Sequence, residues 1–477
     1  MKLSHKPLYY DKSSHSLAQS PGLQRLTLWI FYLLVVIHCV ENTSLIYLHL
    51  PWIDLMYKVR NLMYVLLLAK AGFAAVYRPK ELWFMLAVLA AAALSVFYST
   101  DFALMEFVIL AIALKDLPHR KLLHAFAVIK SVAIFLTLLG TLLNLIPNIV
   151  YNNGNEGVYY TYGFCHRNVL GGNMAAVCLA WLYLRYNNLR KRDVLFWLAM
   201  TGLTYMLALS RTSLIIMVLS IFAITFCHFF GGRIVQDKRF RWIMLLSFAA
   251  LFISCLAGTL FYERDNDTWL LIDKFFTKRL LFASQCLEEY GFSIFGQEIK
   301  FVSTLESQTQ TIIRQEPITL EFLLSKIKHL VAFVQTSAQQ IASGTISAEK
   351  AEITFSANAS RLILDNAYMR VLIYNGIIPG ILFIISYFMA LNHTWMRKNV
   401  ALVAGMMIMA VYGVSERFML DAYYNFPLLL AFISMFHLPT EETRDSYRYP
   451  LVYVGEILMR LAKPFRKDSE QATENVE

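Results

Sequence analysis

Charged residues are scarce in this sequence: Asp, Glu, Lys and Arg together make up only 16% of its 477 residues. A soluble globular chain carries roughly a quarter. Hydrophobic residues make up 57% and the mean hydropathy is +0.50. Apolar runs long enough to cross a bilayer recur along most of the chain. The scarcity of charge therefore excludes an ordinary soluble domain and predicts an all-α polytopic membrane protein.

The sequence also lacks the patterns of metal sites and secretory leaders. Its six cysteines have no metal-ligand spacing, and the pairing to consider is a disulfide between Cys165 and Cys286, both expected outside. The acidic motif Asp265-Asn-Asp267 stands in the polar context of a turn. We therefore expect no metal and no cofactor. The first 24 residues are polar, and the apolar run after them has no convincing signal-peptide cleavage site.

Twelve apolar segments are predicted to cross the membrane, with both chain ends in the cytoplasm. When the N-terminus is placed inside, basic clusters such as 78–80, 185–192 and 233–241 fall on the inner side, as the positive-inside rule requires. Lys58 and Arg60, in the first outer loop, are the exception. The net charge of +10 therefore indicates loops facing anionic lipid, and no nucleic-acid partner is expected. The segments lie near 26–45, 61–77, 82–99, 102–114, 122–146, 168–186, 194–209, 213–230, 242–261, 367–391, 399–415 and 423–437.

A long polar segment interrupts the predicted helices. Leucine, isoleucine and valine recur at helical spacing over 320–334 within it, which predicts an amphipathic helix lying on the membrane or on the bundle as a lid. The alternation of loop charge places this segment outside. The chain is thus divided into a cytoplasmic N-terminal tail (1–25), nine transmembrane helices (26–262), an external loop or lid (263–366), three transmembrane helices (367–437) and a cytoplasmic C-terminal tail (438–477).

Polar residues gather at the outer ends of the predicted helices, and each has an ordinary structural explanation. Asp365 or Asn366 suits the N-cap of the helix that re-enters the membrane, and Asn168 suits the cap of the sixth span. Arg211 stands in a tight hairpin between two apolar segments, where an arginine reaches water or lipid headgroups. Arg279, close to two phenylalanines, suits an interfacial anchor.

The same residues, taken as a set on one side of the membrane, indicate phosphate chemistry. A guanidinium matches phosphate geometry bidentately and keeps its charge, so Arg211 and Arg279 suit the two phosphates of a diphosphate. A carboxylate or imidazole beside them is what a hydroxyl nucleophile needs to lose its proton. Asp365, His166 and Glu416 are the candidates for that base.

These motifs, in this order, resemble the Wzy-type polysaccharide polymerases and the related O-antigen ligases, most closely the capsular and exopolysaccharide polymerases of Gram-positive bacteria. The likeness runs from about the fifth span to the last, and the first hundred residues match only in hydropathy. Each motif is weak alone. The motifs are Gly163-Phe-Cys-His-Arg-Asn168, Leu209-Ser-Arg-Thr-Ser-Leu214, Thr277-Lys-Arg279, Tyr290-Gly-Phe-Ser-Ile-Phe-Gly-Gln297, the stretch from Leu364 to Gly376, and Ser415-Glu416.

The resemblance implies a membrane glycosyltransferase that joins oligosaccharide repeat units carried on undecaprenyl diphosphate, at the outer face of the cytoplasmic membrane. It implies that Arg211 and Arg279 hold the diphosphate and that Asp365 occupies the place of the proposed base of the ligases, a histidine. The implied partners are the polyprenyl-diphosphate-linked oligosaccharide, the lipid bilayer, and the chain-length regulator and flippase of the same pathway. Supporting residues would be Asn168, Asn366, Tyr368 and Gly376.

Two departures from the family pattern stand out. Family members commonly have His-Pro-Asn where this chain has His166-Arg167-Asn168, so Arg167 is either an additional phosphate contact or inert. The stretch 300–358 is longer than the family leads one to expect. Two other functions stay open: a ligase that transfers finished glycan to another acceptor, and a flippase or exporter of lipid-linked sugars. A transporter should place charge at mid-bilayer depth, whereas Lys70, Lys130 and Arg370 are expected near the ends of their spans.

Overall fold

The computed structural model describes residues 20–48, 50–152, 158–275, 278–299, 364–436, 449–450, 453–454 and 457. These residues are mostly helical, with one short antiparallel hairpin of β1 (Val150–Asn152) and β2 (Val158–Tyr160). The helices are α1 (Pro21–Glu41), α2 (Pro51–Phe73), α3 (Pro79–Ser99), α4 (Ala103–Ala113), α5 (His119–Leu142), α6 (Arg167–Arg185), α7 (Lys191–Ala208), α8 (Arg211–Gln236), α9 (Lys238–Leu260), α10 (Asp267–Phe275), α11 (Arg279–Tyr290), α13 (Ala367–Ile373), α14 (Ile377–Met396), α15 (Val400–Ser415) and α16 (Phe426–Met435).

Six of the described helices are long and apolar enough to cross a membrane, namely α1, α3, α5, α8, α9 and α14. Three shorter apolar helices, α4, α15 and α16, lie among them. Helical residues occur in each of the twelve predicted segments, although α2 begins ten residues before its segment, at Pro51. Proline at the first position of a helix fixes a favourable φ and removes an amide that would have no partner. The chain is therefore a multi-pass helical protein by the length and composition of its helices. The number of membrane crossings stays a prediction.

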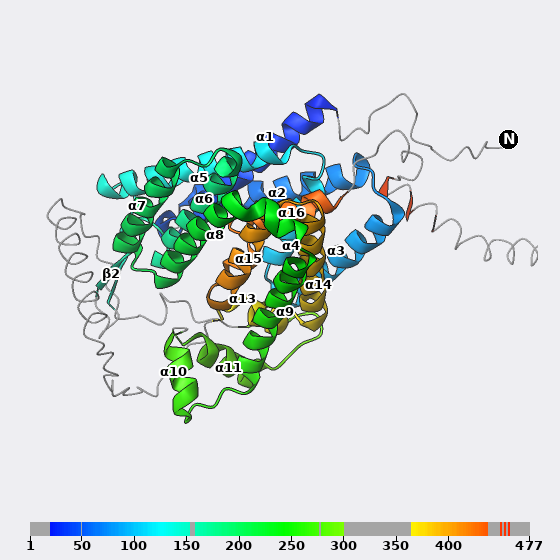
Figure 1. Ribbon diagram of the computed structural model, residues 1–477. Coiled ribbons are helices and arrows are strands. Elements are labelled where there is room, and N and C mark those ends of the chain that lie inside the picture. Colours follow the sequence, from blue (N-terminus) through cyan, green and yellow to red (C-terminus); the bar gives the residue numbers. More distant parts are fainter. Residues whose placement is uncertain are drawn as a thin grey trace, which may run out of the picture.

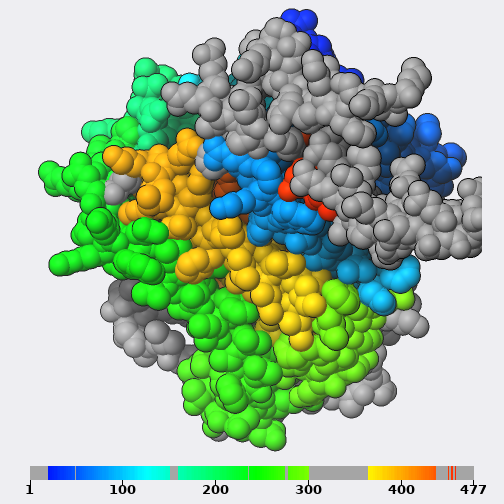
Figure 2. All heavy atoms as spheres, turned by 90° about the vertical axis from the view of Figure 1, so that its right-hand side faces the viewer, coloured from blue at the N-terminus to red at the C-terminus, as the bar shows by residue number. Residues whose placement is uncertain are grey.

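The helices pack into one bundle, in which most residues of α6 and α15 are buried. α8 packs on α15, α6 and α7, while α5 joins α6 to α1. α14 lies between α9 and α3, and Figure 2 shows its yellow-to-orange band between the green and the blue helix. α10 and α11 lie outside the bundle, beyond the end of α9 (Figure 1). The candidate residues sit at the ends of these helices.

The predicted tenth span, 367–391, is divided into α13 and α14 by a break at Tyr374–Gly376. Gly376 has φ +101°, and a Cβ there would lie 2.3 Å from the backbone nitrogen of Gly296. The segment Ser293–Gln297 packs against the break, since Ile377 N–H donates to Ser293 O and Gln297 N–H donates to Tyr374 O. Only glycine permits this close approach. Gly376 thus allows the segment Ser293–Gln297 to dock onto the bundle.

The structure decides two of the sequence expectations and leaves a third untested. Lys130 lies halfway along α5 and is fully buried, so the expectation that it sits near a helix end is wrong. Cys165 and Cys286 are both free thiols, so the disulfide is also wrong; Cys286 instead packs in a small apolar cluster with Met369 and Ile373. The amphipathic helix expected over 320–334 lies outside the described residues.

Candidate functional site

Glu416, at the C-terminal end of α15, binds residues from three other helices. Its Oε1 accepts hydrogen bonds from Asn168 Nδ2 at 3.0 Å and Thr212 Oγ1 at 3.3 Å. The same oxygen is 3.2 Å from Arg279 Nη2. The residue is only 3% exposed. Burial raises the pKa of the Glu416 carboxyl, and Arg279 opposes that rise. This carboxylate holds α6, α8 and α11 to α15.

Arg279 connects Glu416 to a second carboxylate. Its Nη1 forms an ion pair with Asp365 Oδ2, while its Nη2 faces Glu416. The arginine is the first residue of α11, and Lys278 before it has φ 64°, the left-handed region. Asp273 accepts the next amides of the helix, from Leu280 and Leu281. A carboxylate at a helix N-terminus is favoured by the helix dipole, so Asp273 fixes the start of α11 and with it Arg279.

Asp365 and Asn366 were both candidates for the N-cap of the helix that follows, and in the structure only Asn366 is that cap. The Asn366 side chain accepts from the amides of Tyr368 and Met369 and is the N-cap of α13. Asp365 takes no part in that cap and turns to Arg279. About a quarter of the Asp365 side chain is exposed (24%), whereas only 4% of the Glu416 side chain is. Of the two carboxylates on Arg279, Asp365 is therefore the more accessible to a ligand.

The N-cap of α6 is His166, and not Asn168 as the sequence suggested. His166 is the N-cap of α6, because its Nδ1 accepts from Asn168 N–H at 3.1 Å. Burial, and then the charge of Arg167, lowers the pKa of His166 to about 4. The imidazole is therefore neutral at neutral pH and a weak base. Asn168 uses its side chain on Glu416 and does not cap.

Three arginines border this cluster without an ion pair to another described residue. Arg211 is the first residue of α8 and is exposed, and the turn before it is as tight as predicted, with only Leu209 and Ser210 between α7 and α8. Arg417 follows Glu416 and is exposed as well. Arg167, at the start of α6, stacks on the Tyr159 ring, with Cζ 3.8 Å from the ring centroid. Their guanidinium groups add positive charge beside Arg279.

Helix direction adds to that positive charge. Asn168 is the second residue of α6, Thr212 the second of α8, and Arg279 the first of α11, and all three bind Glu416 Oε1. The N-terminus of a helix carries a partial positive charge and unpaired amides. Three such ends, together with the neighbouring arginines, form a site suited to a ligand with more than one negative charge.

Two residues of the site escaped the sequence analysis. Thr212 is the neighbour of Arg211, and its hydroxyl reaches Glu416. Asp273 is six residues before Arg279 and caps α11. Asp273 lies within α10 and not immediately before α11, where an N-cap residue stands, so no sequence signal marks it. Two of the residues expected to support the site have structural roles. Tyr368 is buried and donates to Ala410 O at 2.8 Å, and Gly376 lets the segment Ser293–Gln297 dock.

Across the described ranges, no group of three or more His, Cys, Asp and Glu side chains is arranged to hold a metal ion. The expectation of metal-independent chemistry stays a prediction. No family model matches the chain, and neither a curated protein nor a solved structure matches it significantly. The geometry of this cluster is therefore the basis for a functional assignment.

Proposed function

We propose that the chain is an integral-membrane glycosyltransferase of the polymerase type, acting at the outer face of the cytoplasmic membrane. The donor is a glycan on a polyprenyl diphosphate and the acceptor is the next lipid-linked repeat unit. The observation that carries this proposal is Arg279, held between the carboxylates of Asp365 and Glu416 and close to the arginines at the starts of α6 and α8. A diphosphate and an activated hydroxyl need this pairing of cations with a carboxylate.

The chemical step assigns a separate role to each carboxylate. An acceptor hydroxyl attacks the anomeric carbon of the donor as its bond to the diphosphate oxygen breaks, and the diphosphate departs with the bonding electrons. Asp365 takes the hydroxyl proton, since it is the more exposed carboxylate. Arg279 and Arg211 stabilise the charge that develops on the leaving group. Glu416, enclosed by three partners, positions Arg279.

Arg211→Lys is expected to lower transfer by about tenfold or more, because lysine keeps the charge but loses bidentate phosphate geometry. The measurement is polymer formed per unit of membrane-inserted protein. Arg190→Lys is the matched control, since Arg190 is an N-cap position at a helix start on the predicted inner side. Normal polymer from Arg211→Lys would mean that the arginine only reaches lipid headgroups.

The side of the membrane is tested by single cysteines on a background in which the six native cysteines are replaced. Arg264→Cys is expected to react with an impermeant thiol reagent in intact cells, and Arg190→Cys is not, from the alternation of loop charge. Both arginines are exposed in the structure. Labelling of Arg190→Cys alone would place Arg279 and Asp365 on the inner side and remove the proposed substrate from their reach.

Export of a lipid-linked glycan is a second candidate, and Lys130 is the observation that favours it. This buried lysine lies in the middle of α5, where its Nζ donates to Asn173 Oδ1 at 2.7 Å and faces the Tyr424 ring. Charge at such depth is typical of transport pathways. Cells lacking the chain distinguish the two functions. Lipid-linked single repeats accumulating on the outer face support the transferase, and accumulation on the inner face supports the exporter.

A further inference from the structure

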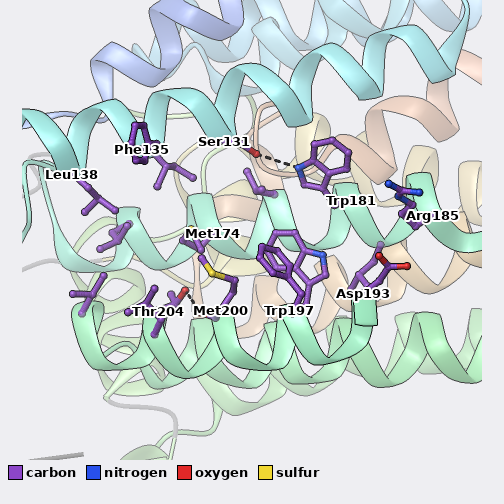
Figure 3. A pocket seen from close by; sticks show the side chains of 17 residues that line it. Ser131, Phe135, Leu138, Met174, Trp181, Arg185, Asp193, Trp197, Met200 and Thr204 are labelled. Carbon is purple, nitrogen blue, oxygen red and sulfur yellow. Dashed lines mark hydrogen bonds between the residues drawn. The ribbon is translucent and has the colours of Figure 1, made fainter. Parts of the chain in front are cut away.

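An apolar groove of about 560 Å³ lies between α5, α6 and α7. Figure 3 shows side chains of the three helices pointing into it, among them Phe135, Met174 and Trp197. α5 and α7 both pack on α6, which forms the floor. Phe135 on one wall and Phe196 on the other are 63% and 56% exposed. The groove therefore opens on the surface of the bundle, where a membrane protein meets lipid.

The two hydroxyl groups that line the groove already have partners. Ser131 Oγ donates to Ala127 O and accepts from Trp181 Nε1 at 3.1 Å, a bond drawn in Figure 3. Thr204 Oγ1 donates to Met200 O. Water gains little in a cavity whose polar groups are satisfied. The groove is thus suited to a hydrocarbon chain.

The groove is longer than one leaflet of a bilayer. It is lined from Leu170 to Arg185 along α6, which is about 22 Å at about 1.5 Å per residue. Half of a hydrocarbon core is about 15 Å. A phospholipid acyl chain from the outer leaflet fills only part of that length, whereas a long isoprenoid fills all of it. Arg185 and Asp193 mark the far end.

The other end of the groove reaches the candidate site. Leu170 is two residues after Asn168, and Leu207 is four residues before Arg211. Arg167 and Arg211 are the first residues of α6 and α8. A lipid with its tail in the groove therefore has its headgroup beside two arginines that form no ion pair with another described residue.

We propose that this groove binds the isoprenoid chain of the polyprenyl diphosphate and delivers its headgroup to Arg211, an inference that rests on the proposed function. The groove then selects the donor by tail length, and the arginines select it by charge. An ordinary phospholipid satisfies neither requirement in full.

The test measures binding of two probes to the full-length protein in phosphatidylcholine nanodiscs. Undecaprenyl diphosphate carries both headgroup and long tail, while geranyl diphosphate carries the same headgroup on a short tail. The groove variant is Met200→Trp/Leu203→Trp, in which two lining residues of α7 become larger. The matched control is Leu195→Trp/Leu198→Trp, on exposed positions of the same helix that do not line the groove.

The groove variant is expected to bind undecaprenyl diphosphate about tenfold or more weakly, because displaced isoprene units lose their apolar contacts. It should bind geranyl diphosphate as the parent does, and the control variant should match the parent with both probes. Equal binding of undecaprenyl diphosphate by parent and groove variant would overturn the groove while the proposed function stands. A parent that binds neither probe would overturn both. A groove variant that loses only co-purified phospholipid would show an annular lipid site instead.

Discussion

Asp365→Asn is expected to lower glycan transfer by about a hundredfold or more, because asparagine keeps the shape of the side chain but takes no proton. The variant should still insert into the membrane, since Asp365 is half-buried and caps no helix. The measurement is polymer formed per unit of inserted protein, with Asp365→Glu as the variant that retains a carboxylate. Asp365→Glu should keep more activity than Asp365→Asn.

The neighbouring residue supplies the control for this prediction. Asn366→Ala removes the N-cap of α13, which costs about 1 kcal/mol of local stability, and leaves the Asp365 carboxylate in place. It should lower transfer far less than Asp365→Asn does. An Asp365→Asn variant as active as the parent would take this carboxylate out of the mechanism. Glu416 would then be the next candidate, ahead of His166, whose pKa of about 4 makes it a weak base.

Arg279→Lys is expected to have a comparable effect, a loss of about a hundredfold. Lysine carries one compact charge and has no second arm with which to bind Asp365 and Glu416 together. Loss of one group that stabilises transition-state charge costs about this much in other enzymes. The positive charge is retained, so Glu416 keeps a cation nearby and the bundle should fold. Initial rates on a lipid-linked donor measure the effect.

Arg264→Lys is the matched control for Arg279→Lys. Arg264 forms an ion pair with Glu288 of α11, the helix that begins at Arg279, and their side chains are 51% and 60% exposed. An exposed pair of this kind contributes about 0–1 kcal/mol, so Arg264→Lys should leave both transfer and expression unchanged. Parent-like rates from Arg279→Lys would show that Arg279 serves only to hold α11 to the start of α13 and the end of α15.

Proximity in the sequence was a poor guide to role within the candidate site. Asp365 and Asn366 are adjacent and cap helices about equally well, yet the backbone directs Asn366 to the amides of α13 and Asp365 to Arg279. His166 and Asn168 are separated by one residue. Asn168 was expected to cap α6, but His166 is the cap and Asn168 binds Glu416. The backbone conformation of the turn decides which of the two side chains points back toward the amides of its own helix. Amino-acid composition does not encode that direction.

The sequence by itself determined the apolar helices of the bundle and the order of the candidate residues, but not α10, α11 or the break between α13 and α14. Long apolar runs have to satisfy their backbone hydrogen bonds internally in lipid, so they become helices wherever they occur. The short hairpin before Arg211 followed from the two apolar segments that flank it. Such features depend on neighbours in the chain, and reading along the chain is sufficient to find them.

Only the tertiary structure decided which of these residues meet. Glu416 binds Asn168 and Thr212, which are 248 and 204 residues away, and Arg279, which is 137 residues away. The tertiary structure also places Lys130 in the interior of the bundle and leaves a groove between α5 and α7. These facts depend on how helices rotate and cross when they pack. Hydropathy along the chain fixes that each helix is apolar, but not which of its faces meets which neighbour.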